Sequence, residues 1–261
     1  MKHALRPNDD AKGRIMNRIS TAVLALSASL LLGAATLPQS ARAEGTLMPF
    51  ASVLKGERNF LSGYDPRNTD GTYNVVIEMP AGTIAKYAVN RATGLMELEQ
   101  KDGGPSYVQY LPVPANFGSV PHTLIAGTGN LKAIVLGPAL PRGSVVKGRL
   151  IGSLNVADDA GARMQAIFVA DNTPFADVKS LADLDARFPG VPAILQTWAA
   201  NADGKAKSSI AFKGRAQSIP LVGGAILAYE EAMVTEADKR PLDANGNPQL
   251  YRWPGAKNVG E

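Results

Sequence analysis

The side chains able to perform covalent chemistry are few in this chain of 261 residues. It contains no cysteine, which removes thiolate catalysis and cysteine-ligated zinc sites. A serine hydrolase would have to use His122, because the only other histidine is His3, and no G-x-S-x-G elbow is present. A glycine-rich phosphate loop that opens a helix is also absent. Asp, Glu, Lys and Arg are therefore the candidates for a site.

Residues 1–43 have the pattern of a secretory signal peptide. A basic start is followed by an apolar run over 22–35 and by the A-x-A cleavage pattern Ala41-Arg42-Ala43. The apolar run is shorter than the roughly 20 residues that a membrane-spanning helix needs. We therefore expect cleavage after Ala43, translation from Met1 or Met16, no remaining membrane span, and a periplasmic or secreted location.

Removing this segment changes the charge of the chain. Residues 1–43 hold 6 of the 27 basic and 2 of the 23 acidic residues, which leaves 21 of each. A remainder with no net charge argues against nucleic-acid binding, which needs a concentrated basic face.

The rest of the chain predicts short strands followed by helices. Alternating or β-branched segments predict strands at 73–79, 86–90, 95–98, 122–126, 132–136, 144–156 and 164–170. Helical spacing predicts helices at 180–188, 191–200 and 222–233, with Gly223 and Gly224 indicating close packing in the last. Residues 44–72 read as an irregular lead-in, and the proline-containing segment 234–261 reads as an extended tail. This spacing of strands is typical of an antiparallel barrel or sandwich.

The order of motifs across 73–233 resembles a family I soluble inorganic pyrophosphatase. The resemblance rests on the successive segments VVIEMPAG, NRATGLMEL, PANFGSVPHTL, LPRGSVVKGRLIGSLNVADDAGARMQAIFV and FKGRAQSIPLVGGAILAYEEA. It implies a mainly-β α+β fold, in which helices pack on one side of a highly twisted, five-stranded, OB-like barrel. We take 73–233 as the pyrophosphatase-like domain.

The resemblance also implies a chemistry whose parts are mostly missing. The family hydrolyses pyrophosphate with several Mg²⁺ ions, which need a cluster of Asp and Glu oxygens. Where the family has D-x-D-P-x-D, this chain reads Gly127-Thr128-Gly129-Asn130-Leu131-Lys132, so a cation replaces the third aspartate. Further family positions that carry metal or phosphate groups are occupied by Ala88, Gln100 or Lys101, Val113, Phe117, Arg163, Gln165, Ala199 and Ala200.

Three residues still match catalytic positions of the family: Glu78, Lys86 and Asp158, the last also a metal position. Taken alone, they read as a strand residue, a solvated cation and a turn former. The resemblance implies that magnesium binding and hydrolysis are weakened or lost. It leaves a pseudoenzyme that binds pyrophosphate or a phosphate-like anion through Lys86, Lys132 and Arg163.

The main alternative is an active, magnesium-dependent diphosphatase with substitute carboxylates. Asp65, Asp70 or Asp102 would have to enter the pocket, or the tail would have to supply Asp243. Members of the family often form oligomers, but the sequence does not identify a surface for a homo-oligomer.

Overall fold

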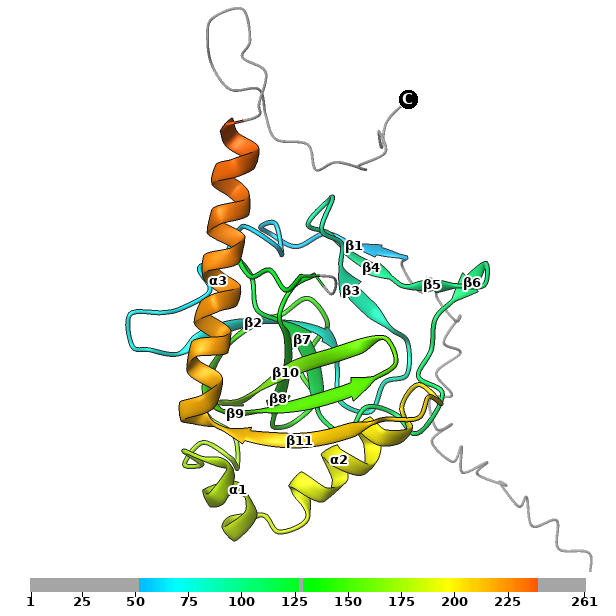
Figure 1. Ribbon diagram of the computed structural model, residues 1–261, viewed down its shortest axis with the longest axis vertical. Helices are drawn as coiled ribbons and strands as arrows, with labels where there is room; N and C mark the ends of the chain where they lie inside the picture. Colours follow the sequence, from blue (N-terminus) through cyan, green and yellow to red (C-terminus); the bar gives the residue numbers. More distant parts are fainter. Residues whose placement is uncertain (1–51, 127–128, 239–261) are drawn as a thin grey trace, which may run out of the picture. The chain divides into compact units, whose positions relative to one another are not determined.

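The computed structural model describes residues 52–126 and 129–238 (Figure 1). The signal-peptide prediction and the tail residue Asp243 lie outside the described residues. No helix in the described ranges is both long and apolar enough to cross a membrane.

Five strands form a ring. In order around it they are β2 (Tyr73–Met79), β7 (Asn116–Ser119), β8 (Lys132–Leu136), β10 (Gly161–Ala170) and β9 (Val145–Asp158). The ring closes because β9 pairs with β10 and, through its first residues, with β2. The β8–β10 pair is parallel and the others are antiparallel. The predicted barrel is confirmed, and β11 (Ser209–Gly214) extends the sheet along the later part of β9.

Smaller strands cover one side of the ring. The strands β1 (Val53–Leu54), β4 (Met96–Leu98) and β3 (Tyr87–Val89) form a three-stranded sheet. A short hairpin of β5 (Gln100–Lys101) and β6 (Gly104–Pro105) follows it. The predicted lead-in thus includes one strand, β1.

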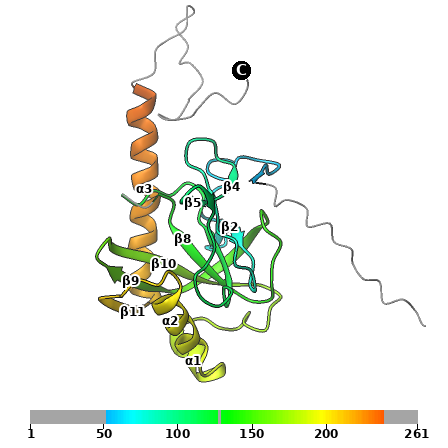
Figure 2. The same ribbon diagram turned by 90° about the vertical axis from the view of Figure 1, so that its right-hand side faces the viewer.

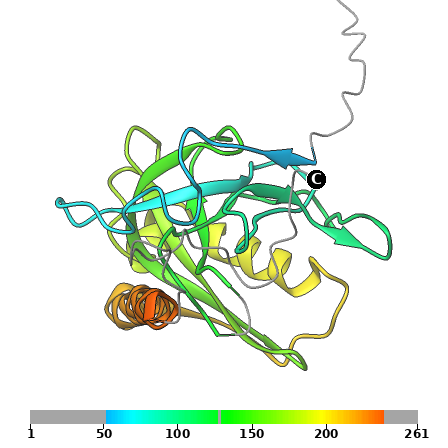
Figure 3. The same cartoon turned by 90° about the horizontal axis from the view of Figure 1, so that it is seen from above.

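Three helices complete the described part of the chain: α1 (Leu181–Arg187), α2 (Val191–Asn201) and α3 (Arg215–Asp238). The Ser180 hydroxyl accepts a bond from the Asp183 amide and so caps α1. Figure 2 shows α1 and α2 on one side of the barrel, and Figure 3 looks along α3, which stands beside the sheet. The third helix starts before the predicted 222 and continues past Met233.

The strand β2 is buried on both faces, which explains its nearly continuous apolar sequence. Val75 and Ile77 pack in a cluster that includes Val222 of α3, whereas Val76 packs on the other face with Tyr87. Glu78 interrupts this run, and its carboxylate must therefore be satisfied by protein groups.

The predicted strand at 122–126 is wrong. The Thr123 hydroxyl donates to Val120 O and accepts from the Leu131 amide, and these local bonds hold the segment as a loop. His122 lies in the left-handed region, with φ +49°. The strands β7 and β11 were not predicted, since polar residues and glycine interrupt both.

Candidate functional site

Among the Asp and Glu residues that the structure describes, Glu78 alone is buried over the whole residue, which is 3% exposed. Its Oε2 accepts from Lys132 Nζ at 2.8 Å, and the Glu78 side chain is only 4% exposed. Its Oε1 accepts from the Ser119 hydroxyl at 2.8 Å and from the Val89 amide at 3.0 Å. Glu78, which the resemblance predicts at a catalytic position, is therefore bound to a cation of the protein itself.

The barrel backbone brings this group together from adjacent strands. The pairing of β2 with β7 shifts register between Ile77 and Met79, and such a bulge at Glu78 re-aims a side chain. Gly118 opposite Ile77 is required, because a Cβ there would lie 2.0 Å from Val76 O. Ser119 in turn pairs with Lys132 on β8, which places the ammonium beside the carboxylate.

A second charged cluster lies where β9 turns into β10. Asp158 Oδ2 accepts from Arg163 at 2.5 Å and from Lys207 at 3.2 Å, and its side chain is 3% exposed. Lys207 also donates to both oxygens of Asp203, at 2.6 and 2.7 Å. We call Asp158, Arg163, Asp203 and Lys207 the charge quartet. It contains two carboxylates and two cations, so its formal charge is zero.

The quartet favours the ionised form of both carboxylates. The hydrogen bond from Arg163 lowers the pKa of Asp158 to about 2, although burial acts in the opposite direction, and Lys207 adds to the lowering. Burial also acts to raise the pKa of Asp203, but the bonds from Lys207 and the Lys205 amide outweigh it and lower that pKa.

These shifts predict a loss of stability in acid. Because the pKa of Asp158 falls from 3.8 to about 2 on folding, the ionised group stabilises the fold above about pH 4. That contribution should disappear as the pH falls from 4 toward 2. Urea unfolding between pH 2 and 6 measures it, and Asp158→Asn should flatten this acid limb. An unchanged limb in the variant would show that other groups cause it.

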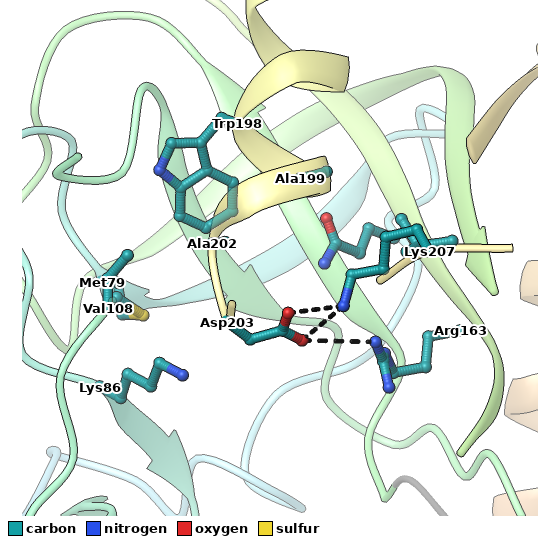
Figure 4. A pocket seen from close by; sticks show the side chains of 11 residues that line it. Met79, Lys86, Val108, Arg163, Trp198, Ala199, Ala202, Asp203 and Lys207 are labelled. Atoms are coloured by element: carbon teal, nitrogen blue, oxygen red, sulfur yellow. Dashed lines mark hydrogen bonds and ion pairs between the residues drawn. The ribbon is translucent and has the colours of Figure 1, made fainter. Parts of the chain in front are cut away.

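Three members of the quartet, Arg163, Asp203 and Lys207, line one wall of a pocket of about 160 Å³ (Figure 4). Figure 4 shows the Lys86 ammonium pointing into this pocket, across from Asp203. The Lys86 ammonium forms no hydrogen bond or ion pair with the described residues. The Lys86 backbone is held by a bond from its amide to Ser106 O and one from the Glu99 amide to its carbonyl. The remaining lining residues are Met79, Val108, Val156, Gln165, Trp198, Ala199 and Ala202.

The predicted site residues are thus divided between two places. Lys86 and Arg163 line the same pocket. Asp158 lies behind them as the partner of Arg163, whereas Lys132 is paired with Glu78 and is not among the pocket-lining residues. The side chain of Lys132 is 37% exposed, so its ammonium still contacts solvent.

The described carboxylates are not arranged as ligands of a magnesium centre. No group of three or more Asp, Glu, His or Cys residues within the described ranges could hold a metal ion. The candidates for substitute ligands are exposed: Asp102 is at the β5–β6 turn, and Asp65 and Asp70 are in the lead-in. Asp70 accepts bonds from the amide and hydroxyl of Thr72 instead.

Sequence reasoning missed Asp203 and Lys207. They lie four residues apart in the segment between α2 and β11. Such a connecting segment has no alternation of apolar and polar residues from which the direction of its side chains could be predicted. It also missed Trp198 as a pocket wall. This indole packs on Phe117, with ring centroids 4.9 Å apart, and donates to Leu111 O.

Comparison with known sequences gives one consistent result. The family profile described as inorganic pyrophosphatase matches residues 75–218. The chain is similar to an inorganic pyrophosphatase of Gluconobacter oxydans, with 35% identity over 115 residues, which are 42% of this chain and 64% of the relative. It is 37% identical over 89 residues to one of Helicobacter pylori, covering 33% of this chain and 48% of the relative. The matches thus span less than two thirds of these curated relatives.

The solved structures that are similar share the fold. A type I inorganic pyrophosphatase from P. falciparum superposes with a TM-score of 0.64 at 19% identity, covering 70% of this chain and 65% of that one. The inorganic pyrophosphatase from Thermus thermophilus gives 0.54 at 23% identity, covering 66% of this chain and 99% of the other.

Proposed function

The chain belongs to the inorganic pyrophosphatase family, and we propose that this member has lost most or all magnesium-dependent hydrolysis and instead binds a phosphate-type anion without metal. One observation carries the proposal. Both carboxylates that match catalytic positions, Glu78 and Asp158, are already bound to protein cations.

Those cations compete with magnesium for the same oxygens. A Mg²⁺ ion at Glu78 would have to displace the Lys132 ammonium or lie a few Å from it. Two unit charges 4 Å apart at an effective dielectric of 20 repel by about 4 kcal/mol, so an ammonium and a divalent ion repel by about 8 kcal/mol. The same reasoning applies to Asp158 with Arg163 and Lys207.

The pocket beside the quartet provides charges suited to an anion. Three of its lining residues are cations, Lys86, Arg163 and Lys207, and one is a carboxylate, Asp203. The Nη1 and Nη2 atoms of Arg163 bind Asp158, but the guanidinium has five N–H donors and so keeps others for phosphate oxygens, and Lys86 adds a point charge from the opposite side. With about 160 Å³, the pocket is below the roughly 300–1,000 Å³ of drug-sized sites, which favours a small anion.

Asp203 is the internal competitor for this anion. Its carboxylate accepts bonds from Lys207 and lies 3.8 Å from Arg163, at the place where an oxyanion would bind the same cations. Its side chain is 32% exposed, so an incoming anion reaches the same cations from solvent. We infer that an anion binds only when it replaces Asp203 in some of its contacts with Lys207 and Arg163.

Titration calorimetry with pyrophosphate and with phosphate in EDTA tests the proposal. We expect binding that persists without metal, about tenfold weaker in Lys86→Ala, since loss of one charged hydrogen bond costs about 1.5 kcal/mol or more. Asp203→Asn should bind more tightly. Lys147→Ala, which removes an exposed lysine of β9 outside the pocket, is the matched control. No heat of binding in EDTA, or equal affinities in the Lys86 and Lys147 variants, would contradict the anion site.

An active diphosphatase remains the second candidate, because the relatives are named inorganic pyrophosphatases. It would need carboxylates brought in by a rearrangement, since Asp65, Asp70 and Asp102 do not line the pocket. We further propose that the protein acts in the periplasm or outside the cell, on the basis of the signal-peptide pattern in residues 1–43.

A further inference from the structure

The helix α3 carries two faces of different character. Val222, Ala225 and Tyr229 are buried against the barrel and its covering strands. Residues spaced by four form a ridge that starts beside the barrel, where Arg215 Nε donates to Leu150 O, and winds onto the outer side, because such residues are neighbours on a helix surface. We call this the outer ridge, and it consists of Arg215, Ile219, Gly223, Leu227 and Glu231.

The outer ridge exposes large apolar side chains. Leu227 is 58% exposed and Ile219 is 38% exposed. Arg215 and Glu231, at the two ends, are also exposed. Gly223 lies at the middle, so the ridge presents an apolar centre between two ends of opposite charge.

The glycines of α3 are not explained by packing within the described chain, contrary to the expectation from the sequence. A Cβ built at Gly223 or Gly224 meets no described atom within 4 Å. Glycine is one of the poorest helix formers, so two adjacent glycines inside a helix weaken it. Their open surface would, however, allow another helix backbone to approach closely.

We propose that α3 pairs in antiparallel orientation with α3 of a second copy of this chain, across a two-fold axis at Gly223. The spacing of the ridge fits such an axis. Ile219 and Leu227 are equally far from Gly223, so Ile219 of each copy lies opposite Leu227 of the other. Arg215 and Glu231 are related in the same way. A two-fold interface requires this kind of self-complementary patch.

Charge selects a second copy and fixes its direction. Arg215 is the first residue of α3 and follows Lys213 of β11, and Glu230 and Glu231 lie in the later part of α3. An antiparallel pair places the basic end of each helix against the acidic end of the other, whereas a parallel pair would oppose like charges. Arg215 Nε donates to Leu150 O, which anchors this side chain at the start of the ridge.

Sedimentation velocity over a concentration series of the full chain tests the pairing. In a series that reaches about 100 µM chain, we expect monomer and dimer in equilibrium, with more dimer at higher concentration, as for a weak interface. Leu227→Glu should remain monomeric throughout. Leu221→Glu is the matched control, because Leu221 is an exposed leucine of the same helix, 39% exposed, that lies off the outer ridge. It should dimerise like the unaltered chain.

Gly223→Leu gives a second test, because it should raise the melting temperature of the monomer but reduce dimerisation. Leucine is a good helix former and the Cβ position is open, so the melting temperature of the dilute monomer should rise by about 2–4 °C. The same side chain should abolish dimerisation by blocking the close approach. A monomer at every concentration of the unaltered chain would overturn the proposal. Dimerisation unaffected by Leu227→Glu and Gly223→Leu would overturn it too.

Discussion

Mixed with pyrophosphate and Mg²⁺, the purified chain should release phosphate at least about a thousandfold more slowly than a typical enzyme, whose turnover is about 10 s⁻¹. Metal-assisted hydrolysis needs ions that activate a water molecule and neutralise the phosphate oxygens. Here the Glu78 carboxylate is already paired with Lys132, and the Asp158 carboxylate is paired with Arg163 and Lys207. A colorimetric phosphate assay measures the rate, and turnover near the typical value would contradict the proposed loss of activity.

Lys132→Asp tests whether the lysine at position 132, and not a failure to fold, prevents magnesium from binding. The variant removes the ammonium that pairs with Glu78 and places a carboxylate on β8, next to the carboxylate of Glu78 on β2. We expect a lower melting temperature without metal, because two like charges then face each other. Mg²⁺ should raise it again, since a ligand at 100 times its dissociation constant stabilises by about 2.7 kcal/mol. The same Mg²⁺ concentration should leave the melting temperature of the unaltered chain unchanged.

Four of the five barrel strands could be predicted because their sequences are locally consistent with the fold, and only β7 was missed. The strand β2 was predicted with its observed ends, since a β-branched run ends at Pro80. The strand β8 was predicted equally well, although it starts with Lys132. Burial on both faces of these strands imposes apolar residues, and this pattern is visible without any alignment.

The ion pairs could not be predicted, because they depend on contacts between distant segments. The pair of Lys132 with Glu78 joins residues 54 positions apart, and the bulge that aims Glu78 leaves no signal in the sequence. Lys207 reaches Asp158 from a connection between elements. The sequence therefore placed Lys132 and Arg163 among the candidate anion-binding residues, but it did not predict that they bind Glu78 and Asp158.

The backbone at Gly129, in the segment that the resemblance aligns with the family's acidic motif, disfavours an aspartate. Gly129 has φ +90° and bridges Ile125, and a Cβ there would lie 3.1 Å from Arg91 Cδ. An aspartate at this position would be strained, because L-residues with side chains rarely adopt such a φ. Reversing the substitutions one by one would therefore not rebuild the motif, which is why Lys132 is the informative position.

Lys132→Met should lower the free energy of unfolding by about 2–4 kcal/mol, because it leaves a buried carboxylate without its cation. The Glu78 side chain is 4% exposed, and the bonds from Ser119 and Val89 reach only its other oxygen. Urea unfolding at neutral pH measures the change. A loss below about 0.5 kcal/mol, as for an exposed pair, would mean that solvent satisfies Glu78.

The double variant Glu78→Gln with Lys132→Met should recover most of this stability. An amide oxygen can still accept from the Ser119 hydroxyl and the Val89 amide, and no charge is left buried. The two substitutions should therefore couple by about 1–3 kcal/mol in a double-mutant cycle. Coupling of that size would mean that Lys132 performs for Glu78 the charge compensation that a bound metal provides elsewhere, so that the barrel is stable with its carboxylate ionised and no metal present.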